Sequence, residues 1–112
     1  MEAISCHKDY LKLLTSAHYS QRRALIDTST YSQIKLLCEI ILNTITGTFD
    51  LDEATKQKLY KKKETLKTIL KKSTPKRRKQ LLLRKNLSTL EAILNLAIPY
   101  IEQWHTNQES TS

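Results

Sequence analysis

Apolar residues recur along the chain every three or four positions, which is the spacing of amphipathic helices. The strongest pattern starts at Ser29 or Thr30 and ends before Gly47, the only glycine, which is typical of the left-handed residue after a helix. Leu36 and Ile40 widen the apolar arc over most of the circumference, so this helix is expected to be central. The expected core stripe consists of Ile34, Leu37, Cys38, Ile41, Leu42 and Ile45.

Two shorter helices are predicted before this segment, over residues 3–18 and 21–28. Ser20 lies between them and is expected to cap the second helix, because a serine oxygen accepts hydrogen bonds from the free amides of a first turn. The inward positions of the two helices are Ile4, Leu11, Leu14, Ala17 or His18, and Ala24, Leu25 and Ile26.

A long lysine-rich helix is predicted over residues 53–72, with Asp52 as its N-cap. Its apolar stripe is thin and includes the position of Lys63. The stem of Lys63 would therefore have to lie along the core while its ammonium group reaches water. The stripe itself consists of Leu59, Leu66, Ile69 and Leu70.

Proline marks the start of the next predicted helix, over residues 75–85. Thr74 is the expected N-cap and Pro75 the first helical residue, because proline lacks an amide that a first turn leaves unpaired. Four cations open this helix, and Leu81, Leu82 and Leu83 follow.

The last predicted helix covers residues 89–104, and Ser88 with Glu91 has the spacing of a capping box at its start. Pro99 removes one backbone donor, so a kink or an early end is expected there. Residues 106–112 are polar and are expected to be disordered. The apolar face of the helix consists of Leu90, Ile93, Leu94, Ala97, Ile101 and Trp104.

These elements predict an all-α fold, a small compact bundle of about five to six helices with a lysine-rich long helix, as one domain over residues 1–105. One glycine and two prolines are too few for the many turns of a β-sandwich or barrel. No apolar stretch has the length of a signal peptide or a transmembrane segment, so the protein is not expected to be secreted.

Positive charge is concentrated in residues 56–85, which carry fourteen cations and one anion, Glu64. The formal charge of this stretch is +13, whereas the whole chain is +8, so the remaining residues sum to −5. Repulsion between positive charges at this density destabilises the folded protein when no partner is bound. Phosphates along a nucleic acid would neutralise the charges and release counterions. The pattern therefore favours a polyanionic partner, and DNA in particular.

The expected contacts are to phosphate and not to bases, because most of the cations are lysines, which act as point charges. Only Tyr60 lies among them, so stacking of single-stranded bases is not indicated. The prediction is non-specific duplex binding and condensation. The predicted nucleic-acid-binding residues are Lys58, Lys61, Lys62, Lys67, Lys71, Lys72, Lys76, Arg77, Arg78, Lys79, Arg84 and Lys85.

Other interpretations of the same segments stay open. The basic stretch could be a solvated face of a simple helical dimer, and residues 74–79 also have the composition of a nuclear-localisation signal. The helix over residues 89–104 could act on a protein partner, such as a capsid, or on a membrane surface. Its acidic side chains, Glu91 and Glu102, disfavour an anionic bilayer.

Catalytic and metal chemistry is not indicated anywhere in the chain. Cys6 and Cys38 lack the spacing of a zinc site, and the three histidines do not cluster with them. No nucleophile triad, glycine-rich loop or paired carboxylates are visible, so neither an enzyme nor a cofactor is expected. A reducing compartment suits the two distant cysteines.

An ordered pattern over residues 23–86 resembles a known family. It consists of Ala24-Leu25-Ile26, residues 33–39, Asn43, Gly47, Leu51, residues 56–59, 61–63, 76–79 and 81–83. This order is similar to that of short basic proteins from Polinton/Maverick mobile elements and their virus-like relatives, the adintoviruses. The resemblance implies a DNA-condensing virion core component or a membrane-active one, in the host nucleus or the virion.

The chain departs from that family pattern in three respects. Asp52-Glu53 stands where the family has Thr-Pro, and the first twenty residues match no part of it. The final segment lacks the run of glycines that the family has there, which weakens the implied membrane-active role.

Overall fold

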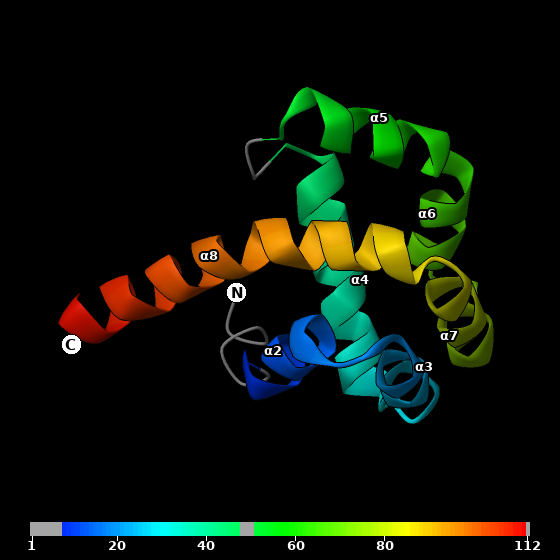
Figure 1. The fold of residues 1–112 in the computed structure, drawn as a ribbon, viewed down its shortest axis with the longest axis horizontal. Coiled ribbons are helices and arrows are strands. Elements are labelled where there is room, and N and C mark those ends of the chain that lie inside the picture. Colours follow the sequence, from blue (N-terminus) through cyan, green and yellow to red (C-terminus); the bar gives the residue numbers. More distant parts are fainter. Residues whose placement is uncertain (1–7, 48–50, 112) are drawn as a thin grey trace.

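The computed structural model describes residues 8–47 and 51–111, with the side chains of residues 8–47 and 51–99, and every regular element in these ranges is a helix. The all-α bundle is therefore confirmed, with more helices than expected (Figure 1). The helices are α2 (Lys8–Ser16), α3 (Tyr19–Asp27), α4 (Tyr31–Ile45), α5 (Glu53–Lys61), α6 (Lys63–Leu70), α7 (Lys76–Lys85) and α8 (Leu87–Thr111).

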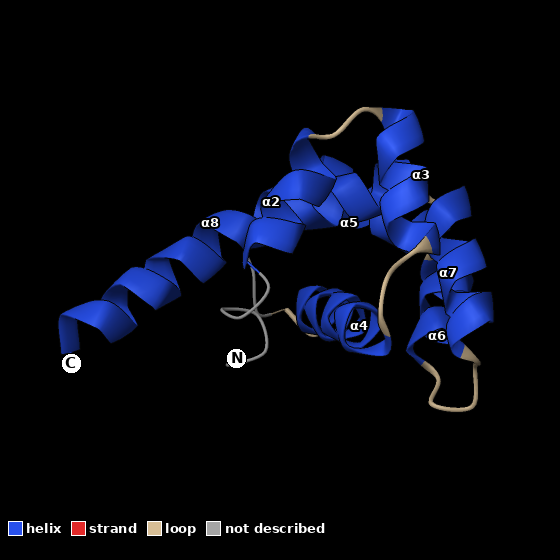
Figure 2. Ribbon diagram, turned by 90° about the horizontal axis from the view of Figure 1, so that it is seen from below, coloured by secondary structure: helices blue, strands red, loops and turns tan. Residues whose placement is uncertain are grey.

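Helix α4 is central, as predicted, and packs against α6, α7 and α8. Helices α2 and α3 lie near one end of α4, and α5 lies near the other, while α8 crosses it (Figures 1 and 2). The carboxyl end of α8 extends away from the other helices. The core is built almost entirely from Leu and Ile side chains of these helices.

The buried side of α4 differs from the predicted stripe. Leu36 and Ile40, expected on the flank, are fully buried, whereas Leu42 and Ile45 are 48% and 47% exposed. The periodicity was a correct guide to an apolar arc, but α4 is apolar over more of its surface than its neighbours cover. Of the uncovered residues, Ile45 lines a groove described below.

The predicted helix over residues 53–72 is two helices, because the chain bends at Lys62 between α5 and α6. The amide of Lys62 donates to the carbonyl of Leu59 at 3.1 Å, a shorter-range bond than the α-helical one. A straight helix would place Lys63 in the core stripe. The bend keeps Leu59 and Leu66 buried, while Lys63 is exposed and lines an apolar groove beside them.

Three predicted helix ends are confirmed. Thr30 caps α4, and its side chain and that of Gln33 bond to each other's backbone amides at 3.2 and 2.9 Å. Asp52 caps α5 by accepting from the amide of Thr55 at 2.7 Å, and bonds from Thr55 lower the pKa of Asp52. Gly47 follows α4 with φ of +87°.

Three other predicted caps are wrong. Helix α3 begins at Tyr19, two residues earlier than Ser20 as N-cap would allow, and His18 is its N-cap. The hydroxyl of Thr74 donates to the carbonyl of Thr68 at 2.7 Å, which closes the loop after α6, and Pro75 takes the N-cap position of α7. Helix α8 begins at Leu87, so Ser88 lies inside its first turn.

Helix α8 is continuous from Leu87 to Thr111 and passes both Pro99 and the predicted end at residue 104. Figure 1 shows it changing direction along its length, which is the expected effect of the missing donor at Pro99. Its predicted apolar face is buried as far as the side chains are described, from Leu90 to Ala97. Ile101 and Trp104 lie outside the described side chains, and the disordered tail over residues 106–112 stays a prediction.

Replacement of Gly47 by alanine is expected to destabilise the protein by about 1 kcal/mol, because a Cβ atom disfavours positive φ. A Cβ there would meet nothing within 4 Å, so the cost comes from the backbone alone. Urea unfolding followed by circular dichroism measures it. Asparagine, which tolerates this conformation, should cost less, and equal stability of all three chains would contradict the assignment.

Candidate nucleic-acid interface

Helix α7, the more basic arm of the predicted site, is held in place by a buried glutamine. The Gln80 side chain is only 2% exposed. Its amide nitrogen lies 3.1, 3.3 and 3.2 Å from the backbone carbonyls of Ile26, Asp27 and Ser29. Two of these carbonyls belong to the last turn of α3 and the third to the turn that follows it. One side chain therefore ties α7 to the end of α3 and fixes how its cations are presented.

Arg84 adds an ion pair to the same junction. Its guanidinium donates to the carboxylate of Asp27 at 3.0 Å, with both side chains about one third exposed. Of the twelve predicted site cations, only Arg84 forms an ion pair within the residues that the structure describes. The charge of Arg84 is thus already balanced inside the fold, unlike the charges of its neighbours.

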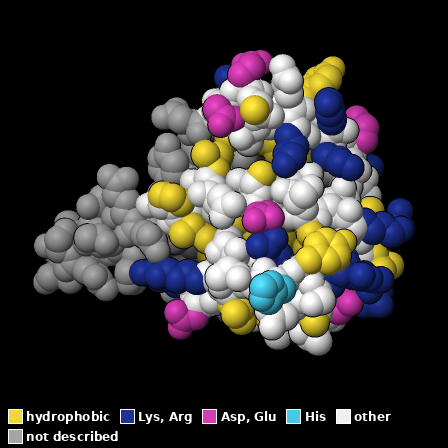
Figure 3. Space-filling view, viewed as in Figure 1, with side chains coloured by type: hydrophobic (Ala, Val, Ile, Leu, Met, Phe, Trp, Pro, Cys, Tyr) yellow, Lys and Arg dark blue, Asp and Glu magenta, His cyan; other side chains and the backbone are white. Residues whose placement is uncertain are grey.

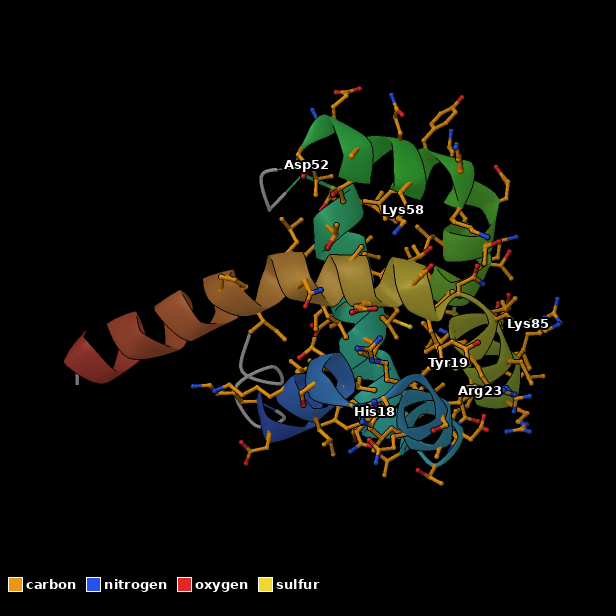
Figure 4. The ribbon with its side chains drawn as sticks, in the orientation of Figure 1. His18, Tyr19, Arg23, Asp52, Lys58 and Lys85 are labelled. Carbon is orange, nitrogen blue, oxygen red and sulfur yellow. The ribbon has the colours of Figure 1, made fainter. Side chains whose placement is uncertain are left out.

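The predicted cations gather around α5, α6 and α7, on the side of the molecule away from the carboxyl end of α8 (Figures 1 and 3). All of them except Lys79 and Arg84 are exposed. They do not form one flat patch. Figure 4 shows Lys58 leaving α5 on the side that faces α8, whereas Lys85 points outward from the opposite edge of α7. A straight duplex would therefore contact a subset of them.

A shallow groove of about 260 Å³ lies between the end of α4 and the bent α5–α6 arm. Its floor is apolar and includes Ile45 and Leu59. Tyr60, which is 76% exposed, lies at its rim, with the Lys63 ammonium 5.9 Å from the centre of its ring. The groove is also lined by Lys56, Lys63 and Lys67. The bend at Lys62 thus brings an aromatic ring and three cations to the edge of an apolar surface.

A larger cavity, of about 530 Å³, lies between α4, the α6–α7 loop and the start of α7. Three predicted cations line it, Lys72, Lys76 and Lys79. The fold adds Lys35 and Tyr31 from α4, which sequence reasoning had not included. Their spacing of four residues places both on one face of α4, but nothing local indicates that α7 packs opposite that face.

Lys79 is half-buried in this cavity, and its ammonium group lies 3.8 Å from the sulfur of Cys38. The Cys38 thiol in turn donates to the carbonyl of Ile69 at 3.7 Å. Burial raises the pKa of the Cys38 thiol, and the nearby Lys79 partly offsets this. Cys38 is therefore a protonated thiol at neutral pH and does not act as a counter-ion for Lys79.

Helix α3 extends the basic edge with Arg23, a second cation that sequence reasoning had not included. Arg23 lies 5.9 Å from the centre of the exposed Tyr19 ring. Helix α3 packs against α7, and Figure 4 shows Arg23 and Lys85 at the same edge. Arg22, in contrast, is bound by Glu91 of α8 at 2.7 Å, so Glu91 joins two helices instead of forming the predicted capping box.

The chain matches no protein-family model, no curated protein and no solved structure. Its site is therefore interpreted from its own geometry. Among the described residues, no three His, Cys, Asp or Glu side chains lie close enough together to hold a metal ion. No helix within them combines the length and the apolar content that crossing a membrane requires.

Proposed function

We propose that this protein is a non-enzymatic accessory protein that binds nucleic acid through the phosphate backbone, without reading its sequence. The observation that carries the proposal is the placement of charge. Residues 56–85 have a formal charge of +13, and within the described residues only one of their cations, Arg84, is paired with a carboxylate. Phosphates would supply the missing counter-charges.

The folded arrangement suits a polymer of phosphates better than a single anion. The cations lie on two helical arms that meet at an angle, α5–α6 and α7, each anchored by buried leucines or isoleucines. Cations on packed helices keep a fixed spacing, so several can contact successive phosphates of one strand. Lysine ammonium groups neutralise phosphates without distinguishing bases.

The proposed context is a virus-like mobile element, and its support is the resemblance of residues 23–86 to Polinton/Maverick and adintovirus proteins. In that setting the protein would coat or condense DNA in the nucleus or the virion. The charge distribution supports nucleic-acid binding independently of this resemblance. The membrane or capsid alternative would need a free apolar face on α8, and that face is buried from Leu90 to Ala97.

Salt dependence is the decisive measurement. If about six phosphates are neutralised on duplex DNA, the affinity should fall roughly 1,000-fold between 50 and 200 mM salt, with a log–log slope near −5. Gel-shift titrations with duplexes of unrelated sequence should give the same slope and similar affinities. A slope near zero would show instead that the lysines are only a solvated face. RNA duplexes in the same titration would identify the preferred polymer.

A further inference from the structure

The cavity between α4 and α7 has the size of a small-ligand site. Its volume of about 530 Å³ falls within the roughly 300–1,000 Å³ of such sites. Four lysines line it, together with Tyr31, Thr74 and an apolar floor, and no acidic residue is among its lining side chains. The lysines are Lys35, Lys72, Lys76 and Lys79.

Lys79 gives the strongest indication of the kind of ligand that the cavity binds. It is half-buried, and its hydrogen-bond partner in the described residues is the neutral Cys38 thiol at 3.8 Å. A partly desolvated cation is stabilised by an anion, and no side chain here supplies one. Lys76 begins α7, where no side chain caps the first turn among the described residues, so free backbone amides add further donors. Together these groups are suited to phosphate.

Other residues that line the cavity are suited to a planar apolar group. Tyr31 is 70% exposed at the rim, and Ile34 and Leu70 belong to the apolar lining. Aromatic side chains beside cations bind unpaired bases by stacking, whatever the base. A base within a duplex is stacked on both faces and would not enter. The lining of the cavity thus combines cations suited to an anion with apolar and aromatic side chains.

We propose that this cavity binds one unpaired, phosphorylated nucleotide, with its phosphate beside Lys72, Lys76 and Lys79 and its base against Tyr31. The nucleotide would be either free or part of a single strand. The inference does not rest on the proposed duplex binding, because a free nucleotide would occupy the cavity in the same way. Duplex contacts would use the exposed lysines outside it.

Cys38 provides a direct test, because it lines the cavity and becomes the only thiol of the full chain after Cys6→Ser. The rate at which a thiol reagent modifies Cys38 is measured with AMP, adenosine, a single-stranded oligothymidylate or a blunt duplex. At about ten times the dissociation constant, AMP or the single strand should slow modification roughly tenfold. Adenosine and the duplex should leave the rate nearly unchanged.

Matched substitutions separate the cavity from the rest of the basic surface. Tyr31→Ala and Lys76→Gln should each weaken AMP or single-strand binding by about tenfold or more. The controls are Tyr60→Ala and Lys12→Gln, which alter a similarly exposed tyrosine on α5 and an exposed lysine on α2, and these should change the affinity less than about twofold. Protection is compared with and without ligand in each variant, so that altered thiol reactivity cancels.

A free nucleotide and a nucleotide within a single strand give different outcomes. Protection by AMP assigns the site to a free nucleotide, and protection by the single strand alone assigns it to a strand. If neither probe protects Cys38, or if adenosine or the duplex protects it equally well, the proposal is overturned. Duplex binding that persists in such a case would leave the proposed function intact. Protection by AMP without salt-dependent duplex binding would remove the proposed function alone.

Discussion

A chain with six exposed cations replaced by glutamine is expected to lose nearly all of its salt-dependent affinity for duplex DNA. Removing one cation–phosphate interaction should reduce the magnitude of the slope of log affinity against log salt concentration by about 0.9. Removing six should therefore reduce it by up to about five. Three of the replacements are on the α5–α6 arm and three on α7. The replaced residues are Lys61, Lys62, Lys67, Arg77, Arg78 and Lys85.

This decrease in affinity should not come from unfolding. All six side chains are exposed and none forms an ion pair in the described residues, so the free protein should be equally stable or more stable once their mutual repulsion is reduced. Thermal unfolding in low salt checks this. A matched pair completes the test. Lys61→Gln with Lys62→Gln should lower the slope, whereas Lys8→Gln with Lys12→Gln removes the same charge from α2, outside the basic surface. Equal effects of both pairs would point to net charge and not to the α5–α7 surface.

Replacement of Gln80 by leucine is expected to destabilise the protein by about 2–3 kcal/mol, although leucine is apolar and of similar size. The side-chain amide of Gln80 donates to three backbone carbonyls at the end of α3 and just after it. A leucine would remove this donor from a buried place. Urea unfolding gives the free energy. Gln57→Leu on the exposed surface of α5 is the control and should change stability by less than about 0.5 kcal/mol.

The position of Gln80 also links stability to the proposed site. Without its hydrogen bonds α7 would be held less firmly against α3, and α7 carries the cavity residues Lys76 and Lys79. If Gln80→Leu proved as stable as the parent chain, the bonds to the three carbonyls would not be what holds α7 in place. The Arg84–Asp27 ion pair, which is partly exposed, is expected to contribute less.

Much of the local structure follows from interactions within one or two turns of the chain, and these were predicted from the sequence. The caps at Thr30 and Asp52 and the positive φ of Gly47 depend on residues three or four positions away at most. Two of the side chains expected at helix ends bond elsewhere instead. Thr74 donates to the carbonyl of Thr68, and Glu91 binds Arg22 of another helix.

The sequence alone determined the all-α class, the central helix and the concentration of positive charge, because periodicity and charge density do not depend on the packing of distant segments. Only the tertiary structure decided which part of the apolar arc of α4 is buried and where the lysine-rich segment bends. It also placed Gln80 in the core and brought Tyr31 and Lys35 to the same cavity as Lys79. These outcomes depend on which helices cover α4, and that is set by the packing of side chains from segments far apart in the chain.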